Sequence, residues 1–120
     1  LGDVYKRQKY QIPFNAIDDF DKVQIQVGEV IKCEPVPKAK KLLVSQIKIG
    51  AETRQIVSGI AKYYKPEEMV GKKVAVITNL KPCKLCGVES QGMILAAGDD
   101  EGNLSVVTVD KDIVSGSEIC

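Results

Sequence analysis

Apolar residues alternate with polar ones, or run together, in short stretches of this chain, and both patterns are typical of β-strands. The strands predicted in this way are 23–32, 42–49, 54–57, 73–80, 92–97 and 104–109. Two short helices are predicted at 17–22 and 66–70, because acids lie in the first turn of each and Pro66 begins the second. Turn-forming residues separate the strands, so the pattern predicts an all-β chain.

The order of these elements is that of a small closed barrel. Five or six strands, with one short helix between the third and the fourth, fit the OB-fold, a five-stranded barrel that binds oligonucleotides. Other small β-barrels share this order, so the order alone does not select among them. Gly28 predicts a bulge or bend in the first strand, and Pro35 and Pro37 are expected to end that strand.

The composition predicts one soluble globular domain. Of the 120 residues, 44% are hydrophobic and 28% are charged, and a chain of this length forms one core. No apolar stretch approaches the roughly 18 residues that span a bilayer, and no signal peptide is visible, so we expect a cytoplasmic location and no membrane partner. We expect residues 1–16 to be a tail, in which 1–8 are a remnant of cloning or read-through, and residues 17–120 to form the domain.

Charge is divided unevenly along the chain. Residues 1–98 hold sixteen Lys and Arg against ten Asp and Glu, whereas residues 99–120 hold one lysine against six acids. A basic body is typical either of a polyanion-binding surface or of ordinary solvated surface. The chain has no histidine, which excludes the usual Ser/His/Asp and Cys/His triads. We therefore expect no catalytic residues in this chain.

Two basic segments could contact a nucleic acid. A lysine loop between the first two strands offers Lys38, Lys40 and Lys41 as point charges for phosphate, or serves only as a solubilising loop. The second segment combines basic and aromatic residues: Arg54, Lys62, Tyr63, Tyr64 and Lys65. Tyrosines stack on bases in many nucleic-acid interfaces, but a Tyr pair also caps the end of a barrel.

A third group of candidate residues lies on one predicted hairpin. Lys81 and Lys84 could donate to phosphate, while Asn79 and Ser90 could bond sugar or phosphate oxygens. Met93 is either an apolar contact at the surface or a core residue. Residues of these kinds on a glycine-rich loop suit the binding of a phosphodiester backbone better than bond-breaking chemistry.

The cysteines raise the question of a metal site. Cys83 and Cys86 form a CxxC pair, which is half of a zinc knuckle, but Cys33 and Cys120 form no second pair. A redox pair would need a βαβ context that the pattern does not predict. We expect no metal and no cofactor, and we interpret the four thiols as reduced and incidental in a cytosolic setting.

Taken together, the motifs resemble a known family. The chain is similar to the tRNA-binding domain at the C-terminus of bacterial methionyl-tRNA synthetases, and to related domains of phenylalanyl-tRNA synthetase β chains and of stand-alone tRNA-binding proteins. The matching segments are 19–23 (DFDKV), 27–28 (VG), 39–43 (AKKLL), 54–60 (RQIVSGI), 64–67 (YKPE), 71–72 (GK), 79–82 (NLKP) and 90–93 (SQGM). The family often carries an arginine where this chain has Gln26, and many members have Asp where it has Lys40.

The resemblance implies an OB-fold with a C-terminal extension from about residue 99, assembled as a homodimer. The strand 104–109 and the tail through Ile113 are candidates for burial between the subunits. It also implies an accessory domain that binds tRNA without sequence selectivity and raises the tRNA affinity of a methionyl-tRNA synthetase catalytic domain, attached or separate. The implied tRNA contacts are Lys40, Lys41, Arg54, Asn79, Lys81, Lys84, Ser90 and Met93. A stand-alone export-chaperone branch shares the fold, so peptide binding is the alternative.

Overall fold

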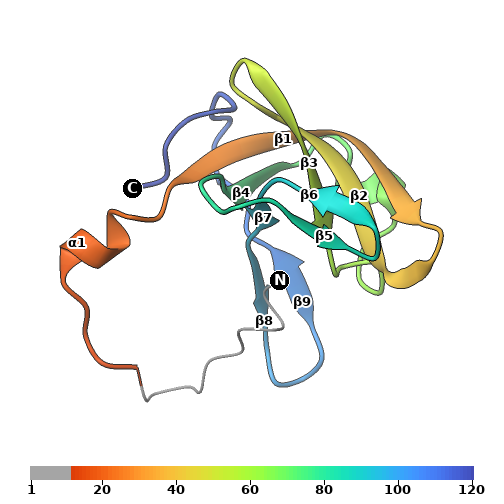
Figure 1. Cartoon of the computed structure of the whole chain (residues 1–120), viewed down its shortest axis with the longest axis horizontal. Coiled ribbons are helices and arrows are strands. Elements are labelled where there is room, and N and C mark those ends of the chain that lie inside the picture. Colours follow the sequence, from red (N-terminus) through yellow and green to blue (C-terminus); the bar gives the residue numbers. More distant parts are fainter. Residues whose placement is uncertain (1–11) are drawn as a thin grey trace.

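The computed structural model describes residues 12–120, and these form a mostly β structure with two short helices (Figure 1). In chain order the elements are α1 (Ile17–Phe20), β1 (Ile25–Val36), β2 (Ala39–Ile49), β3 (Glu52–Ser58), α2 (Pro66–Met69), β4 (Lys73–Ile77), β5 (Cys83–Leu85), β6 (Val88–Ser90), β7 (Met93–Ile94), β8 (Ala96–Gly98) and β9 (Leu104–Val106). The predicted all-β class is confirmed, and α2 lies between β3 and β4 as expected. The predicted remnant at 1–8 lies outside the described residues.

One antiparallel sheet of five strands, in the order β3-β2-β1-β4-β7, forms the body of the domain. The first strand is shared: residues 25–29 pair with β4 and residues 29–36 with β2. Its bulge lies between Val30 and Lys32, not at Gly28, which pairs regularly with Val74. Gly28 is needed for a different reason, because a Cβ there would lie 2.5 Å from Cγ2 of Ile47.

Two of the predicted strands, 23–32 and 92–97, end differently in the structure. β1 passes through Pro35 and ends at Val36, since the register shifts between these residues and a proline is tolerated at an irregular strand end. The predicted strand 92–97 is interrupted at Leu95, whose N–H donates to the carbonyl of Ala75 while its carbonyl accepts from Val107. This crossing point separates the five-stranded sheet from the β8–β9 hairpin, which projects from the body (Figure 1).

The predicted closed barrel is an open sheet whose outer edges are joined by a few hydrogen bonds. Within residues 12–120 no strand ladder links β3 to β7. Residues 83–90 pair with one another as the β5–β6 hairpin, so only Met93 and Ile94 remain to extend the sheet. The N–H of Gln91 donates to the carbonyl of Gln55 over 2.8 Å. Hydrogen bonds of side chains complete this connection between β3 and the segment before β7, which is called the join below.

The core lies on one face of the sheet. Its most buried large side chains come from four strands and from α2: Val30, Leu43, Ile47, Ile56, Met69, Val74 and Val76. Burial of these side chains removes apolar surface from water and supplies the main stabilisation of the fold. Among residues 12–120, neither helix is long or apolar enough to cross a membrane.

The C-terminal extension folds back on its own chain. The N–H of Val27 donates to the carbonyl of Ser117 at 2.9 Å, and the carbonyl of Val27 accepts the N–H of Gly116 at 2.7 Å. Both bonds lie along the part of β1 that does not pair with β2. Val106 is buried in the core, whereas Val107 and Ile113 are exposed. The expectation that a second subunit buries the strand 104–109 is therefore wrong for Val106 and stays a prediction for the exposed residues.

Candidate nucleic-acid interface

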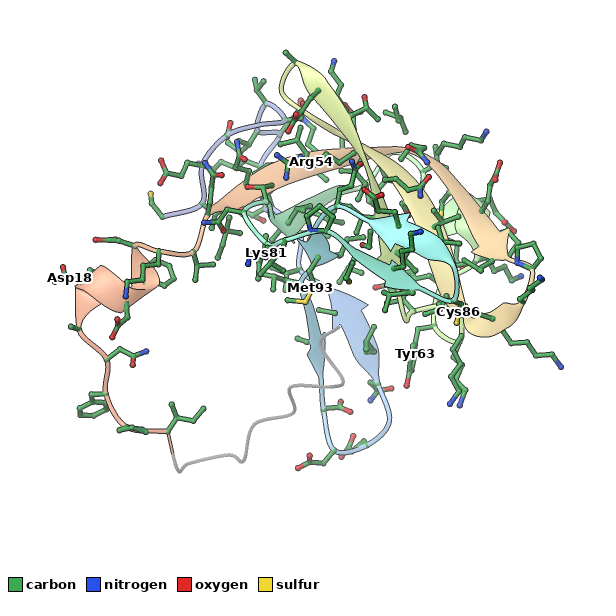
Figure 2. All side chains as sticks on the ribbon, viewed as in Figure 1. Asp18, Arg54, Tyr63, Lys81, Cys86 and Met93 are labelled. Carbon is green, nitrogen blue, oxygen red and sulfur yellow. The ribbon has the colours of Figure 1, made fainter. Side chains whose placement is uncertain are left out.

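The fold brings the predicted lysine loop and the β5–β6 hairpin together at one end of the sheet. Of its three lysines only Lys38 lies in the turn between β1 and β2, whereas Lys40 and Lys41 belong to β2, which begins at Ala39. The name lysine loop is kept below for residues 38–41. A groove of about 520 Å³ separates them, and its lining comes from both: Lys38, Ala39, Lys40, Lys41, Leu42, Leu85 and Cys86. Cys86 marks the tip of the hairpin at this end of the molecule (Figure 2). Two segments that the sequence analysis treated separately, more than 40 positions apart in the chain, thus share one surface.

The β5–β6 hairpin turns through two residues, Cys86 and Gly87. Both have positive φ, at 50° and 80°, as a tight hairpin turn of the primed type requires. Cys83 is paired with Ser90 in the β5–β6 ladder, whereas Cys86 lies in the turn. The two thiols of the CxxC pair are therefore in different parts of the hairpin. All four cysteines are free, and residues 12–120 contain no group of three potential metal-ligating His, Cys, Asp or Glu side chains.

The exposed lysines of the lysine loop and of the segment 81–84 form no ion pair among the described residues. Ion pairs among residues 12–120 engage Lys22, Lys32, Arg54 and Lys73. No ion pair within that part of the chain involves the exposed lysines Lys38, Lys40, Lys41, Lys81 or Lys84. None of them therefore has to break an ion pair within residues 12–120 in order to bind a phosphate.

Asn79 holds the loop that carries Lys81. Its side-chain oxygen accepts the N–H of Gln24 at 2.8 Å, and its amide nitrogen donates to the carbonyl of Lys22 at 2.7 Å. Both ends of the amide are therefore used inside the protein. The structure gives Asn79 a positioning role, fixing the loop after β4 to the segment before β1.

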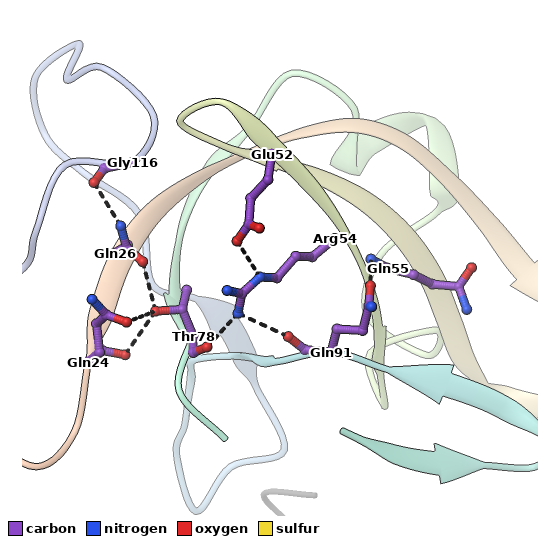
Figure 3. Close-up of polar contacts among 8 residues, drawn as sticks. All are labelled: Gln24, Gln26, Glu52, Arg54, Gln55, Thr78, Gln91 and Gly116. Carbon is purple, nitrogen blue, oxygen red and sulfur yellow. Dashed lines mark hydrogen bonds and ion pairs between the residues drawn. The ribbon is translucent and has the colours of Figure 1, made fainter. Parts of the chain in front are cut away.

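Arg54 connects three parts of the chain (Figure 3). Its Nε donates to Glu52 Oε1 at 2.7 Å, and its Nη1 donates to the carbonyl oxygens of Thr78 and Gln91. About a quarter of the side chain, 26%, is exposed. The guanidinium thus joins β3 to the ends of β4 and β6, where the open sheet has no ladder.

A polar cluster beside Arg54 escaped the sequence analysis. The hydroxyl of Thr78 lies 2.8 Å from Gln26 Oε1 and 3.1 Å from Gln24 Oε1 (Figure 3). Gln26 also donates through Nε2 to the carbonyl of Gly116 at 3.0 Å. The family that the sequence resembles often has an arginine at this position. In this chain Gln26 stands there and connects β1 to the C-terminal extension.

Ser90 is buried, whereas Met93 is only partly buried. Ser90 is 1% exposed, and its hydroxyl accepts the N–H of Val57 at 2.9 Å and donates to the carbonyl of Gly92 at 3.0 Å. Met93 is half-buried in β7 opposite Ile77. The hydroxyl of Ser90 is therefore part of the join between β3 and β7.

The two tyrosines play different parts. The hydroxyl of Tyr64 accepts the N–H of Val106 at 3.1 Å, and Nζ of Lys72 lies 5.7 Å from the centre of its ring. Tyr64 thus caps the core, as one interpretation of the pair predicted. Tyr63 is 44% exposed, and its loop is held to the lysine loop by a hydrogen bond from the N–H of Ala61 to the carbonyl of Lys41.

Comparison with known proteins identifies the family. A family model described as "Putative tRNA binding domain" matches residues 25–118. Over 103 residues the chain is 62% identical to a methionine–tRNA ligase of Methanocaldococcus jannaschii, a match that covers 86% of this chain and 16% of that ligase. The chain therefore spans about a sixth of the length of this curated relative.

Solved structures agree on the fold. A methionyl-tRNA synthetase related protein of Pyrococcus horikoshii superimposes with a TM-score of 0.86 at 38% identity, over 91% of this chain and all of that one. A chaperone, CsaA of Bacillus anthracis, superimposes with a TM-score of 0.81 at 21% identity over 90% of this chain and 100% of that one, which shows a shared fold alone. Because the family model covers most of the residues, the chain belongs to this tRNA-binding domain family.

Proposed function

We propose that this domain binds the sugar-phosphate backbone of tRNA without sequence selectivity and raises the tRNA affinity of a methionyl-tRNA synthetase, attached or separate, in the cytoplasm. The observation that carries the proposal is the set of exposed lysines on the lysine loop and around the β5–β6 hairpin, which form no ion pair within residues 12–120. A lysine is a compact point charge that attracts phosphate without requiring a fixed geometry. The relatives named above support tRNA as the polyanion.

The proposed contacts divide into two kinds. Lys40, Lys41, Lys81 and Lys84 are exposed and would touch phosphates directly. Arg54, Asn79 and Ser90 spend their polar groups on internal bonds, so in this proposal they position the surface. Met93, half-buried beside the join, would provide an apolar contact to sugar or base.

The mechanism is a gain in effective concentration. A second, weak contact on the tRNA body makes binding to the catalytic domain intramolecular, which raises overall affinity without new chemistry. We further propose that the domain is a homodimer, since apolar side chains such as Val107 and Val114 of the extension are exposed. A monomer by analytical ultracentrifugation at micromolar concentration would contradict this part alone.

The test is tRNA binding across a salt series. If four lysines each neutralise one phosphate, log K should fall with log salt with a slope of about −3 to −4. Lys81→Ala and Lys84→Ala should each weaken binding and reduce the slope by about 1. Lys48→Ala is the matched control, because Lys48 is exposed on β2 but lies about 25 Å along the strand from Lys40 and Lys41.

Three outcomes separate the candidate functions. A steep slope with loss at Lys81 and Lys84 but not at Lys48 supports the proposed interface. Equal losses for all three variants would mean non-specific attraction to a basic body. No tRNA binding at low salt, with binding of extended peptides, would favour the chaperone alternative, whose present support is the CsaA fold alone.

A further inference from the structure

The groove between the lysine loop and the hairpin tip combines an apolar floor with a cationic rim. Ala39, Leu42 and Leu85 supply the apolar surface, and three lysines and the Cys86 side chain supply the rest. Acidic side chains are absent from this lining. Its volume of about 520 Å³ lies within the range of roughly 300–1,000 Å³ typical of small-molecule sites.

This combination matches one kind of group on an RNA better than the others. A phosphate backbone alone would use the three lysines and leave the apolar floor in water. An apolar peptide side chain would cover the floor and leave the cations without a partner. An unstacked nucleotide satisfies both, since its base buries apolar surface and its phosphate meets the lysine charges.

We propose that this groove is a nucleotide subsite that takes an unpaired, unstacked base of the bound tRNA, with the adjoining phosphate on Lys38, Lys40 and Lys41. The inference rests on the proposed tRNA binding and deepens it. The exposed ring of Tyr63, whose loop is bonded to Lys41, offers a stacking surface for a neighbouring base. The domain then prefers RNA with accessible single-stranded nucleotides to continuous duplex.

The first experiment compares two RNAs by fluorescence anisotropy at fixed salt: bulk tRNA and a perfectly paired duplex with the same number of phosphates. Leu85→Ser removes apolar floor without changing charge and should weaken tRNA binding about tenfold, as loss of one stacked or buried base does. Its effect on duplex binding should be negligible. Val70→Ser is the control, because Val70 is 49% exposed after α2 and does not line the groove. Equal affinity of the unaltered chain for both RNAs would overturn the inference and leave tRNA binding intact.

The second experiment needs no substitution, so it cannot fail through misfolding. Cys86 lines the groove and Cys120 lies elsewhere, at the C-terminus, and both are exposed. Alkylation of each is followed by mass spectrometry with a short single-stranded RNA, or with an abasic strand carrying the same phosphates. We expect the RNA to slow modification of Cys86 several-fold more than the abasic strand, with no change at Cys120.

The outcomes distinguish the inference from the function on which it rests. Equal protection by both strands means that the groove attracts phosphate only, and protection by neither means that it is not a nucleotide site; either result overturns the inference. If tRNA itself fails to bind, the proposed function fails first. Protection by an apolar peptide, with none by RNA, would assign the groove to peptide binding.

Discussion

Substitution of Ser90 can distinguish a structural role of this residue from a contact with tRNA. The resemblance implies that Ser90 touches tRNA, whereas the structure buries its hydroxyl. The hydroxyl accepts the N–H of Val57 and donates to the carbonyl of Gly92. Ser90→Ala removes both bonds and leaves a buried amide without a partner, which costs about 1–3 kcal/mol. We expect a total loss of about 2–3 kcal/mol, or roughly 10 °C in Tm for a domain of this size.

Ser58 provides a matched control on β3. Its hydroxyl oxygen is also buried, but it has no hydrogen-bond partner within residues 12–120. Ser58→Ala should therefore leave the unfolding free energy nearly unchanged or raise it slightly, because no bond is lost and no polar group stays buried. Both variants are measured by urea and thermal unfolding with circular dichroism, and tRNA affinity is measured at a temperature where each is folded.

The outcome can refute the scaffold role directly. If Ser90→Ala unfolds like the unaltered chain while its tRNA affinity falls about tenfold, a contact worth roughly 1.4 kcal/mol has been lost and Ser90 acts at the interface. If stability falls and the affinity of the folded protein is unchanged, the join between β3 and β7 depends on this hydroxyl. Equal destabilisation of Ser58→Ala would show that the strand tolerates no change there.

Three further predictions follow from local geometry. Gly28→Ala should destabilise the domain by about 1–3 kcal/mol in urea unfolding, because the new methyl would lie 2.5 Å from Ile47. A hydrogen bond from Lys73 and its charge lower the pKa of Asp112, so the stabilisation is full above the unfolded carboxyl pKa of about 4 and is lost as pH falls through the folded pKa. Lys73→Ala should abolish that acid dependence in pH-resolved unfolding. Burial raises the pKa of the Cys33 thiol, so it should react with a thiol reagent more slowly than the other three cysteines.

Much of the sheet could be predicted because local patterns encode it. The apolar stretch 42–49 and the turn at Gly50 mark β2 and the hairpin to β3, and Pro66 with two following acids marks α2. Gly71 ends that turn with a φ of 93°, as a glycine there predicts. These signals lie within a few residues of the structure that they specify, so one sequence is sufficient to find them.

The remaining features depend on contacts between distant segments. The β5–β6 hairpin takes residues 83–90 out of the main sheet, and nothing local shows that its tip will face the lysine loop. The cluster of Arg54 with Thr78 and Gln91 joins residues 24 and 37 positions apart. The sequence shows that these residues are polar. Polarity alone does not distinguish a residue that forms hydrogen bonds inside the protein from one that contacts a ligand at the surface.

This difference explains why the resemblance finds the fold more readily than the site. Arginine presents Nε and Nη1 as donors at two separate points of a planar fork, whereas contact with a phosphate requires only a positive charge within reach. Arg54→Lys should therefore destabilise the domain, because one ammonium nitrogen cannot occupy both the position of Nε beside Glu52 and that of Nη1 beside the carbonyls of Thr78 and Gln91. Lys84→Arg should keep both stability and tRNA affinity. Unfolding and anisotropy measurements on Arg54→Lys and Lys84→Arg test this directly. If Arg54→Lys is as stable as the unaltered chain but binds tRNA more weakly, Arg54 is an interface residue. The exposed lysines alone would then not account for the contact surface.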